Sequence, residues 1–212
     1  MTDDFRRTKY CPKIDDIQKN KQAVADEVLK DHPKAQDMHN FISKNDDRYK
    51  TLFIKAYNGK CSYCGASLDL IPKRMFEIDH FIYEKSPKFN SKKEAGYIEN
   101  LVLACQECNR NKGAFVVDDD SFDALLPDGE QITSTFVRDE MYYIQLSNSV
   151  SDSATIKSFY EQMKLGSEMR RLDYLLMSLI GLQTKMCEDS EVYAKMGEAI
   201  KLLRSKRNIM SC

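Results

Sequence analysis

Apolar residues recur every three or four positions over two stretches near the start of the chain. Residues 14–30 carry Ile14, Ile17, Val24 and Val28 at this spacing, and residues 35–57 repeat it. The spacing is that of a helix with one buried face, so it predicts two amphipathic helices separated near residues 32–33. Asn58-Gly59 predicts the end of the second helix, because glycine readily takes the left-handed conformation that closes a helix.

The helical period returns from residue 153 onward and predicts three further helices, with breaks near Gly166 and over residues 187–190. Residues 136–146 are rich in β-branched and aromatic side chains, and we expect them to form a strand paired with residues 131–135. Residues 116–130 hold six acidic residues and no basic one, and they end in the turn signal Pro127-Asp128-Gly129. We interpret this segment as a solvated connector.

Residues 59–115 have a different pattern, with two short apolar runs at residues 76–82 and 99–105 and then a polar segment suited to a short helix. The chain therefore divides into an N-terminal helical segment (residues 1–58), a middle region (59–115) and a C-terminal region (116–212). The predicted fold class is α+β, with helix dominant and with two short strand-like runs and a short helix in the middle.

Charge and composition exclude several classes of protein. The chain has 212 residues, 32 Lys and Arg against 33 Asp and Glu, and a net charge of -1, so no overall basic field indicates a nucleic acid or a membrane surface as partner. The first residues lack the apolar stretch of a signal peptide, and the longest apolar run, residues 172–182, contains Asp173 and is too short to cross a bilayer. We expect a cytoplasmic protein with no membrane partner.

Four of the seven cysteines form two Cys-x-x-Cys pairs, Cys61 with Cys64 and Cys105 with Cys108. A single pair can be a redox motif, but two pairs supply the four soft ligands of a closed tetrahedral Zn²⁺ site. We therefore predict a structural zinc ion held by these four residues. The other three, Cys11, Cys187 and Cys212, have no partner at this spacing and are interpreted as free thiols.

Several polar residues lie between and after the two cysteine pairs: Asp79-His80, Asn100, and Asn109 directly after Cys108. With the cysteines and Lys112-Gly113, their order resembles the HNH endonucleases, whose ββα-metal motif has a four-cysteine subclass. The resemblance covers residues 59–115, about a quarter of the chain. It implies a ββα-metal core, here flanked by N-terminal and C-terminal α-helices.

Carried over to this sequence, the resemblance implies that His80 is the general base, that Asp79 and Asn109 hold one catalytic Mg²⁺ or Mn²⁺, and that Asn100 braces the loop that aims His80. These roles agree with the chemistry, since histidine accepts a proton near pH 7 and hard oxygen ligands suit Mg²⁺. Many relatives have a proline soon after the Asp-His pair. Here the next proline is Pro87, so the loop after His80 is expected to follow its own path.

Basic residues near this motif are candidates for binding nucleic acid. We expect Arg110 and Lys112 at the start of the short helix, where the amide dipole favours phosphate. Lys85 and Lys88 lie in a basic run that can follow a nucleic-acid backbone or form a solvated loop, and the sequence does not separate the two.

Three further residues have two interpretations each. Glu77 shares a strand face with Asp79 and is an accessory metal ligand or, preferred, a solvated carboxylate. His32 and His39 have no neighbouring metal-ligand motif like the one around His80, and we interpret both as structural or solvated rather than functional.

Two functions from different classes fit these observations. The first is a metal-dependent endonuclease that hydrolyses phosphodiester bonds of nucleic acid, with DNA as the expected substrate. The second is a non-catalytic four-cysteine zinc module that binds nucleic acid or a protein. The core with its helical tail also resembles the HNH nuclease subunits that are paired with ATPases in Septu-like bacterial anti-phage systems, which implies an ATPase or another protein subunit as partner in a defence complex.

Overall fold

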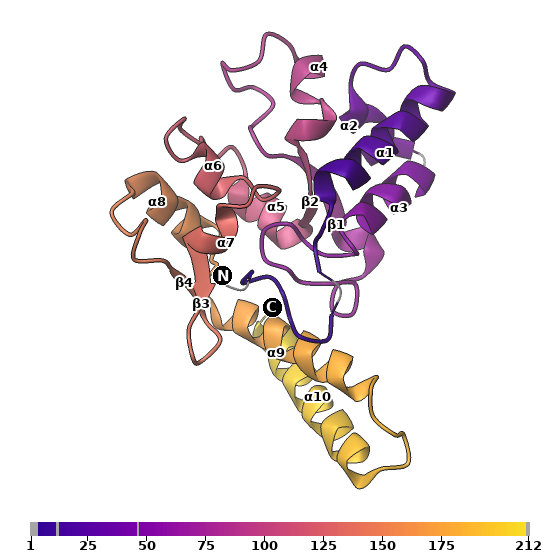
Figure 1. Cartoon of the computed structure of the whole chain (residues 1–212), viewed down its shortest axis with the longest axis vertical. Coiled ribbons are helices and arrows are strands. Elements are labelled where there is room, and N and C mark those ends of the chain that lie inside the picture. Colours follow the sequence, from indigo (N-terminus) through magenta and orange to yellow (C-terminus); the bar gives the residue numbers. More distant parts are fainter. Residues whose placement is uncertain (1–3, 12, 46, 211–212) are drawn as a thin grey trace.

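The computed structural model describes residues 4–11, 13–45 and 47–210, and it places a small antiparallel sheet among helices from both ends of the chain (Figure 1). Cys212 lies outside the described residues. One hydrophobic cluster runs from Phe5 to Leu165 and so includes residues from all three predicted regions. The middle region therefore shares its core with the helices that flank it.

The N-terminal region consists of α1 (Ile17–Asp31) packed against α3 (Asp47–Ala56), with α2 (Met38–Asn40) and a π-helical turn, η1 (Phe41–Asn45), between them. Helix α1 buries Ile17, Val24 and Val28, as its period predicted. The second predicted helix is divided, and its first part begins only at Met38 because the Asp37 side chain caps the Asn40 amide. The predicted helix end is confirmed: Gly59 has φ 68°, and its N–H donates to the Ile54 carbonyl.

The centre of the molecule is a ββα unit. Strand β1 (Phe76–His80) pairs antiparallel with β2 (Leu101–Cys105), and α5 (Gln106–Lys112) follows β2 directly. A 3-10 turn, η2 (Lys73–Met75), precedes β1, while α4 (Lys92–Ala95) and a second 3-10 turn, η3 (Ile98–Asn100), lie between the strands. The predicted α+β fold class, with a ββα core flanked by helices, is confirmed.

The predicted hairpin is present, but its first strand is wrong. Strands β3 (Phe136–Arg138) and β4 (Ile144–Leu146) both lie within residues 136–146 and pair with each other. Residues 131–135 instead hold a helical turn, α7 (Ile132–Thr135). Hydroxyl groups in this turn donate to carbonyls three or four residues back, as Ser134 and Thr135 do to Gln131, which favours the turn over a strand.

The connector is only partly solvated, which corrects the prediction. Its acidic residues at 118–120 and 123 are exposed, but α6 (Phe122–Leu125) buries Ala124 and Leu125. The Asp128 side chain is 1% exposed and accepts hydrogen bonds from Lys21 Nζ at 2.6 Å and from the Tyr57 hydroxyl at 2.8 Å. Asp128 is thus a buried link between the connector and the N-terminal helices.

The three predicted C-terminal helices are confirmed as α8 (Ala154–Gln162), α9 (Glu168–Gln183) and α10 (Glu191–Met210). Helices α9 and α10 run side by side and project from the rest of the molecule as a helical hairpin (Figure 1). None of the helices in the described part of the chain is both long and apolar enough to cross a membrane.

Candidate metal centre and catalytic site

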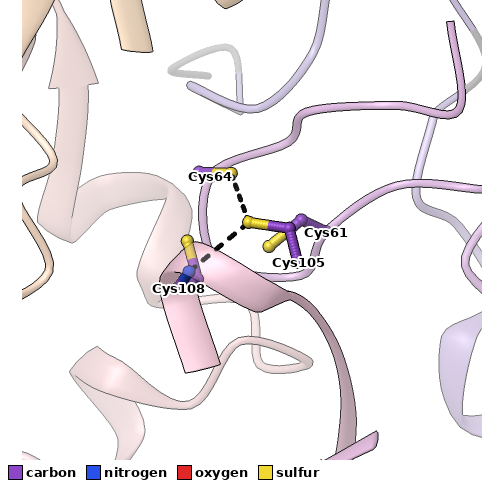
Figure 2. Close-up of side chains that lie close together, drawn as sticks. All are labelled: Cys61, Cys64, Cys105 and Cys108. Atoms are coloured by element: carbon purple, nitrogen blue, oxygen red, sulfur yellow. Dashed lines mark hydrogen bonds between the residues drawn. The ribbon is translucent and has the colours of Figure 1, made fainter. Parts of the chain in front are cut away.

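The four cysteines of the two pairs come together, as predicted (Figure 2). All four are buried, and their sulfur atoms lie within 4.8 Å of one another, with Cys64 Sγ 4.0 Å from Cys105 Sγ. Four sulfurs around a tetrahedral Zn²⁺ with 2.3 Å bonds would be about 3.8 Å apart, close to this spacing. The donor set and its geometry therefore fit a closed four-thiolate metal site.

Backbone contacts bring the two cysteine pairs together. In the first pair, the Cys61 amide donates to the Ala66 carbonyl and the Ser62 amide donates to Leu103 in β2. Gly65 has φ 77°, and a side chain there would meet the Arg6 backbone at 2.7 Å, so the turn requires glycine. The second pair spans the end of β2 and the first turn of α5, where Cys105 is the N-cap residue.

Arg170 from α9 contacts the sulfur cluster, a feature that the sequence did not predict. Its side chain is 1% exposed and its Nη2 lies 3.3 Å from Cys108 Sγ, while its Nη1 lies 3.2 Å from a Glu107 oxygen. Burial alone would lower the pKa of Arg170, but the neighbouring thiolates, Cys108 first, raise it well above the usual value. A divalent ion with four thiolates has a net charge of -2, and Arg170 offsets part of it.

The Cys108 thiol is not readily ionised without a cation. Hydrogen bonds with Cys105, Cys61 and Cys64, together with burial, raise the pKa of Cys108 well above its usual value. A coordinated metal reverses this preference, because a thiol bound to zinc is deprotonated. The cluster is thus chemically suited to a metal ion.

Asp79 lies on β1 with a largely buried side chain. Its Oδ2 accepts a hydrogen bond from the Tyr63 hydroxyl at 2.6 Å and lies 3.1 Å from Lys112 Nζ. Burial raises the pKa of Asp79, opposed mainly by the charge of Lys112. Because Tyr63 lies between Cys61 and Cys64, its side chain joins the metal centre to Asp79. The cysteine spacing did not predict this contact, although Tyr63 lies within the motif.

The predicted phosphate-binding role of Lys112 is not supported. Its side chain is 2% exposed and contacts Asp79 and the His80 carbonyl, at 2.9 Å, so it is not accessible to a phosphate. Helix α5 begins at Gln106, and both Arg110 and Lys112 lie in its last turn rather than at its start. Arg110 is exposed and remains accessible.

The Asn109 side chain is hydrogen-bonded to Glu77. Its Nδ2 donates to Glu77 Oε2 at 2.6 Å, and Gln106 Nε2 donates to Glu77 Oε1 at 3.3 Å. Glu77 is half-buried. The preferred interpretation of Glu77 as a solvated carboxylate is therefore wrong, since it orients the side chain of Asn109.

Asn100 makes three hydrogen bonds with its side chain. Its Oδ1 accepts from the Ile82 amide at 2.8 Å, and its Nδ2 donates to the Ile82 carbonyl at 3.0 Å and to the Ala95 carbonyl at 2.9 Å. Its side chain thus ties the residues directly after His80 to the end of α4.

His80 is half-buried and has a second histidine against its ring. The ring centroids of His80 and His39 are 4.3 Å apart, with 32° between the planes. Burial lowers the pKa of His80 to about 4, with the charge of His39 as the next cause, and burial also lowers the pKa of His39. Of the two interpretations of His39, structural or solvated, the half-buried ring and its contact with the Ile78 carbonyl favour the structural one. No local pattern in the sequence connects His39 with His80.

The basic run is exposed, with part of its charge already paired. Lys88 lies against Asp119 of the connector, and Lys92 lies 3.0 Å from Glu84. Lys85 is exposed. A nucleic-acid-binding role for Lys85 and Lys88 stays a prediction.

Comparison with known proteins agrees with this geometry. Residues 61–115 match the family model described as HNH endonuclease. The chain is 30% identical over 102 residues to Septu protein PtuB of Bacillus mycoides strain KBAB4, in an alignment that covers 43% of this chain and 34% of the relative. The alignment thus spans about a third of the curated relative. No solved structure matches. The resemblance carried by the motifs is confirmed, and residues 61–115 match the HNH endonuclease model.

Proposed function

We propose that this protein is a metal-dependent endonuclease that hydrolyses phosphodiester bonds of nucleic acid, with DNA as the expected substrate. The observation that carries the proposal is the ββα unit itself. It carries Asp79, His80 and Asn109 in a segment that matches the HNH endonuclease model. The four clustered cysteines join the first residues of this segment to the end of β2 and the start of α5.

His80 acts as the general base in this proposal. With its pKa lowered to about 4 by burial, the imidazole is neutral at pH 7 and able to accept a proton from water. A phosphate anion bound beside the ring would raise this pKa toward the working pH, because a nearby negative charge favours the imidazolium. Asn100 supports this role through its hydrogen bonds to Ile82, which hold the chain just after the base.

Asp79 and Asn109 would hold the catalytic ion. The contacts of the Asp79 carboxylate with Tyr63 and Lys112 both use Oδ2, and Asn109 donates its Nδ2 to Glu77. Among the described residues, these contacts do not use Oδ1 of either residue, and these two oxygens are the proposed metal ligands. This donor set fits Mg²⁺ or Mn²⁺. Such an ion, when bound, stabilises the negative charge of the phosphate and of the leaving oxygen. The four cysteines would hold a structural Zn²⁺, a different metal at a separate site.

We further propose that the protein is the nuclease of a bacterial defence system and acts with another protein subunit such as an ATPase. The similarity to Septu protein PtuB supports this. The net charge of -1 agrees with it, since a nuclease with no overall basic field binds nucleic acid weakly by itself and gains from a partner.

Cleavage of plasmid DNA tests the proposed activity. Wild type, His80→Ala and His32→Ala are compared with Mg²⁺, with Mn²⁺ and with EDTA, and zinc is measured by elemental analysis. His32 is a matched control, since it is an exposed histidine of the N-terminal region whose ring packs on Phe41. We expect metal-dependent cleavage that falls by about 100-fold or more in His80→Ala alone, with zinc retained in all three proteins.

Equal cleavage by wild type and His80→Ala would overturn the proposal. An intact plasmid with every protein, together with retained zinc and no second binding event on titration with Mn²⁺, would instead favour the non-catalytic zinc module. Single-stranded DNA and RNA are included as substrates in the same experiment, so that an active enzyme with another substrate is recognised.

A further inference from the structure

We propose that His39 is a positioning residue, which holds the imidazole of His80 in its working orientation by packing against one face of the ring. This inference rests on the proposed function of His80. His39 lies outside the segment that matches the HNH model, in the short helix α2, so the N-terminal region would supply part of the catalytic site.

The first step in the argument is the strand that His39 contacts. The Phe81 amide donates to the Asn100 carbonyl, so in the register of β1 and β2 the backbone groups of Ile78 and His80 face away from β2. His39 Nε2 lies 3.1 Å from the Ile78 carbonyl oxygen. A carbonyl can only accept, so Nε2 carries the proton, and this hydrogen bond sets the tautomer and the direction of the His39 ring.

The second step is the contact between the rings. With their centroids 4.3 Å apart and 32° between their planes, the two rings are in close, tilted contact. His80 lies on β1, the same strand whose Ile78 carbonyl accepts the hydrogen bond from His39. The His39 ring therefore limits rotation of the His80 ring about its Cβ–Cγ bond, a torsion that is otherwise broad for histidine.

The third step is the anchoring of His39 itself. The Met38 amide donates to the Gly96 carbonyl at 2.9 Å, and the Ser43 hydroxyl donates to the His39 carbonyl at 2.6 Å. A Cβ atom on Gly96 would lie 2.2 Å from Asp37 Oδ1, so only glycine allows α2 to approach this closely. Helix α2 is thus fixed to the loop between β1 and β2, and the backbone of His39 is held in place.

Three substitutions separate the stacking from the hydrogen bond. His39→Phe keeps a ring against His80, His39→Gln keeps an N–H for the Ile78 carbonyl, and His39→Ala removes both. We expect kcat for nucleic-acid cleavage to stay within about threefold of wild type in His39→Phe and to fall by about tenfold to 100-fold in the other two, because catalysis is sensitive to small displacements of a reacting group. KM is expected to change little.

The controls exclude a loss of fold. His32→Ala should cleave as wild type does, and zinc content and the thermal midpoint should be similar in all variants. Wild-type kcat in His39→Ala would overturn the proposal. Equal impairment of His39→Phe and His39→Ala, with the fold intact, would overturn the role of the stacked ring.

A readout without cleavage separates this inference from the proposed function. The ring ¹H–¹³C signals of His80 are recorded by NMR in the zinc-loaded wild type and the three variants. We expect a single ring-current-shifted set in wild type and in His39→Phe, and a shifted or broadened set in His39→Gln and His39→Ala. If wild type cleaves nothing while these signals behave as expected, the function fails and the positioning contact stands. Unchanged His80 signals in His39→Ala would overturn the positioning itself.

Discussion

Several side chains of the flanking helices contact residues 61–115, and two of them, His39 and Arg170, lie against the candidate functional groups of this segment in different ways. From the N-terminal region, His39 packs on His80 and bonds to the strand that carries it. From the C-terminal region, Arg170 lies against the sulfur cluster and adds a positive charge to it. We call the N-terminal region (residues 1–58) and the C-terminal region (residues 116–212) the two flanks. The N-terminal flank contacts the candidate catalytic residue, and the C-terminal flank contacts the candidate metal centre.

The two flanks also differ in how much of them is buried. In the N-terminal region, Val28, Phe53 and Tyr57 have no exposed surface, and the pair of Lys21 with Asp128 is 1% exposed on both sides. In α10, Leu202 is 72% exposed and Ile209 is 77% exposed. The N-terminal helices are therefore part of the shared core, whereas the far helix of the C-terminal hairpin adds little to it.

Loss of the metal centre should have the largest effect, because it affects both flanks. In Cys108→Ser we expect zinc to be lost and cooperative unfolding to be weakened or absent, since structural zinc supplies on the order of 10 kcal/mol of folding free energy in small domains. Elemental analysis and thermal unfolding measure this. Cys187→Ser, at an exposed free cysteine, is the control. Retained zinc and an unchanged midpoint in Cys108→Ser would contradict the assignment of the site.

Removing the charge from the C-terminal flank should be the next largest change. Arg170→Met leaves the buried cluster without its cationic neighbour, and we expect a loss of about 3–5 kcal/mol in the free energy of unfolding, together with weaker zinc binding. Denaturant unfolding and competition with a chelator measure the two effects. Arg204→Met, at an exposed position of α10, should change neither. Equal stability of the two variants would show that Arg170 does not compensate the cluster.

Breaking the buried ion pair should weaken the link between the connector and the N-terminal helices and leave the metal centre intact. Asp128→Asn leaves the Lys21 charge buried without its counter-ion, although the amide still accepts a hydrogen bond, and we expect a loss of about 3 kcal/mol with zinc retained. The matched control is Glu191→Gln, which breaks the exposed pair with Lys195 and should cost less than about 0.5 kcal/mol. If Asp128→Asn released zinc, the ion pair and the metal centre would not be independent.

The smallest change tests the link between the two sites. Tyr63→Phe removes only the hydroxyl that donates to Asp79, so we expect about 1 kcal/mol less stability and about tenfold weaker binding of Mn²⁺, with zinc unchanged. A calorimetric titration with Mn²⁺ measures the affinity. Unchanged Mn²⁺ binding would mean that the hydroxyl does not orient Asp79 for a metal.

Local patterns predicted a large part of the fold. The helical period identified α1 and the three C-terminal helices, because each buries one face and repeats its apolar residues accordingly. The spacing of the cysteines predicted their cluster, since two Cys-x-x-Cys pairs satisfy one tetrahedral ion. The hairpin at residues 136–146 was assigned the wrong first strand, because hydroxyl side chains in residues 131–135 stabilise a helical turn that apolar alternation does not reveal.

The sequence by itself determined the resemblance of residues 61–115 to the HNH endonucleases, the order of the polar residues in that segment and the helical nature of the regions on both sides, because each depends on neighbours in the chain. Only the tertiary structure decided that Lys112 is buried against Asp79, that Glu77 holds Asn109, and that His39 and Arg170 reach that segment. The physical reason is the same in each case. Whether a charged or aromatic side chain faces water or another side chain depends on how distant segments pack, and burial then sets its charge and its partners.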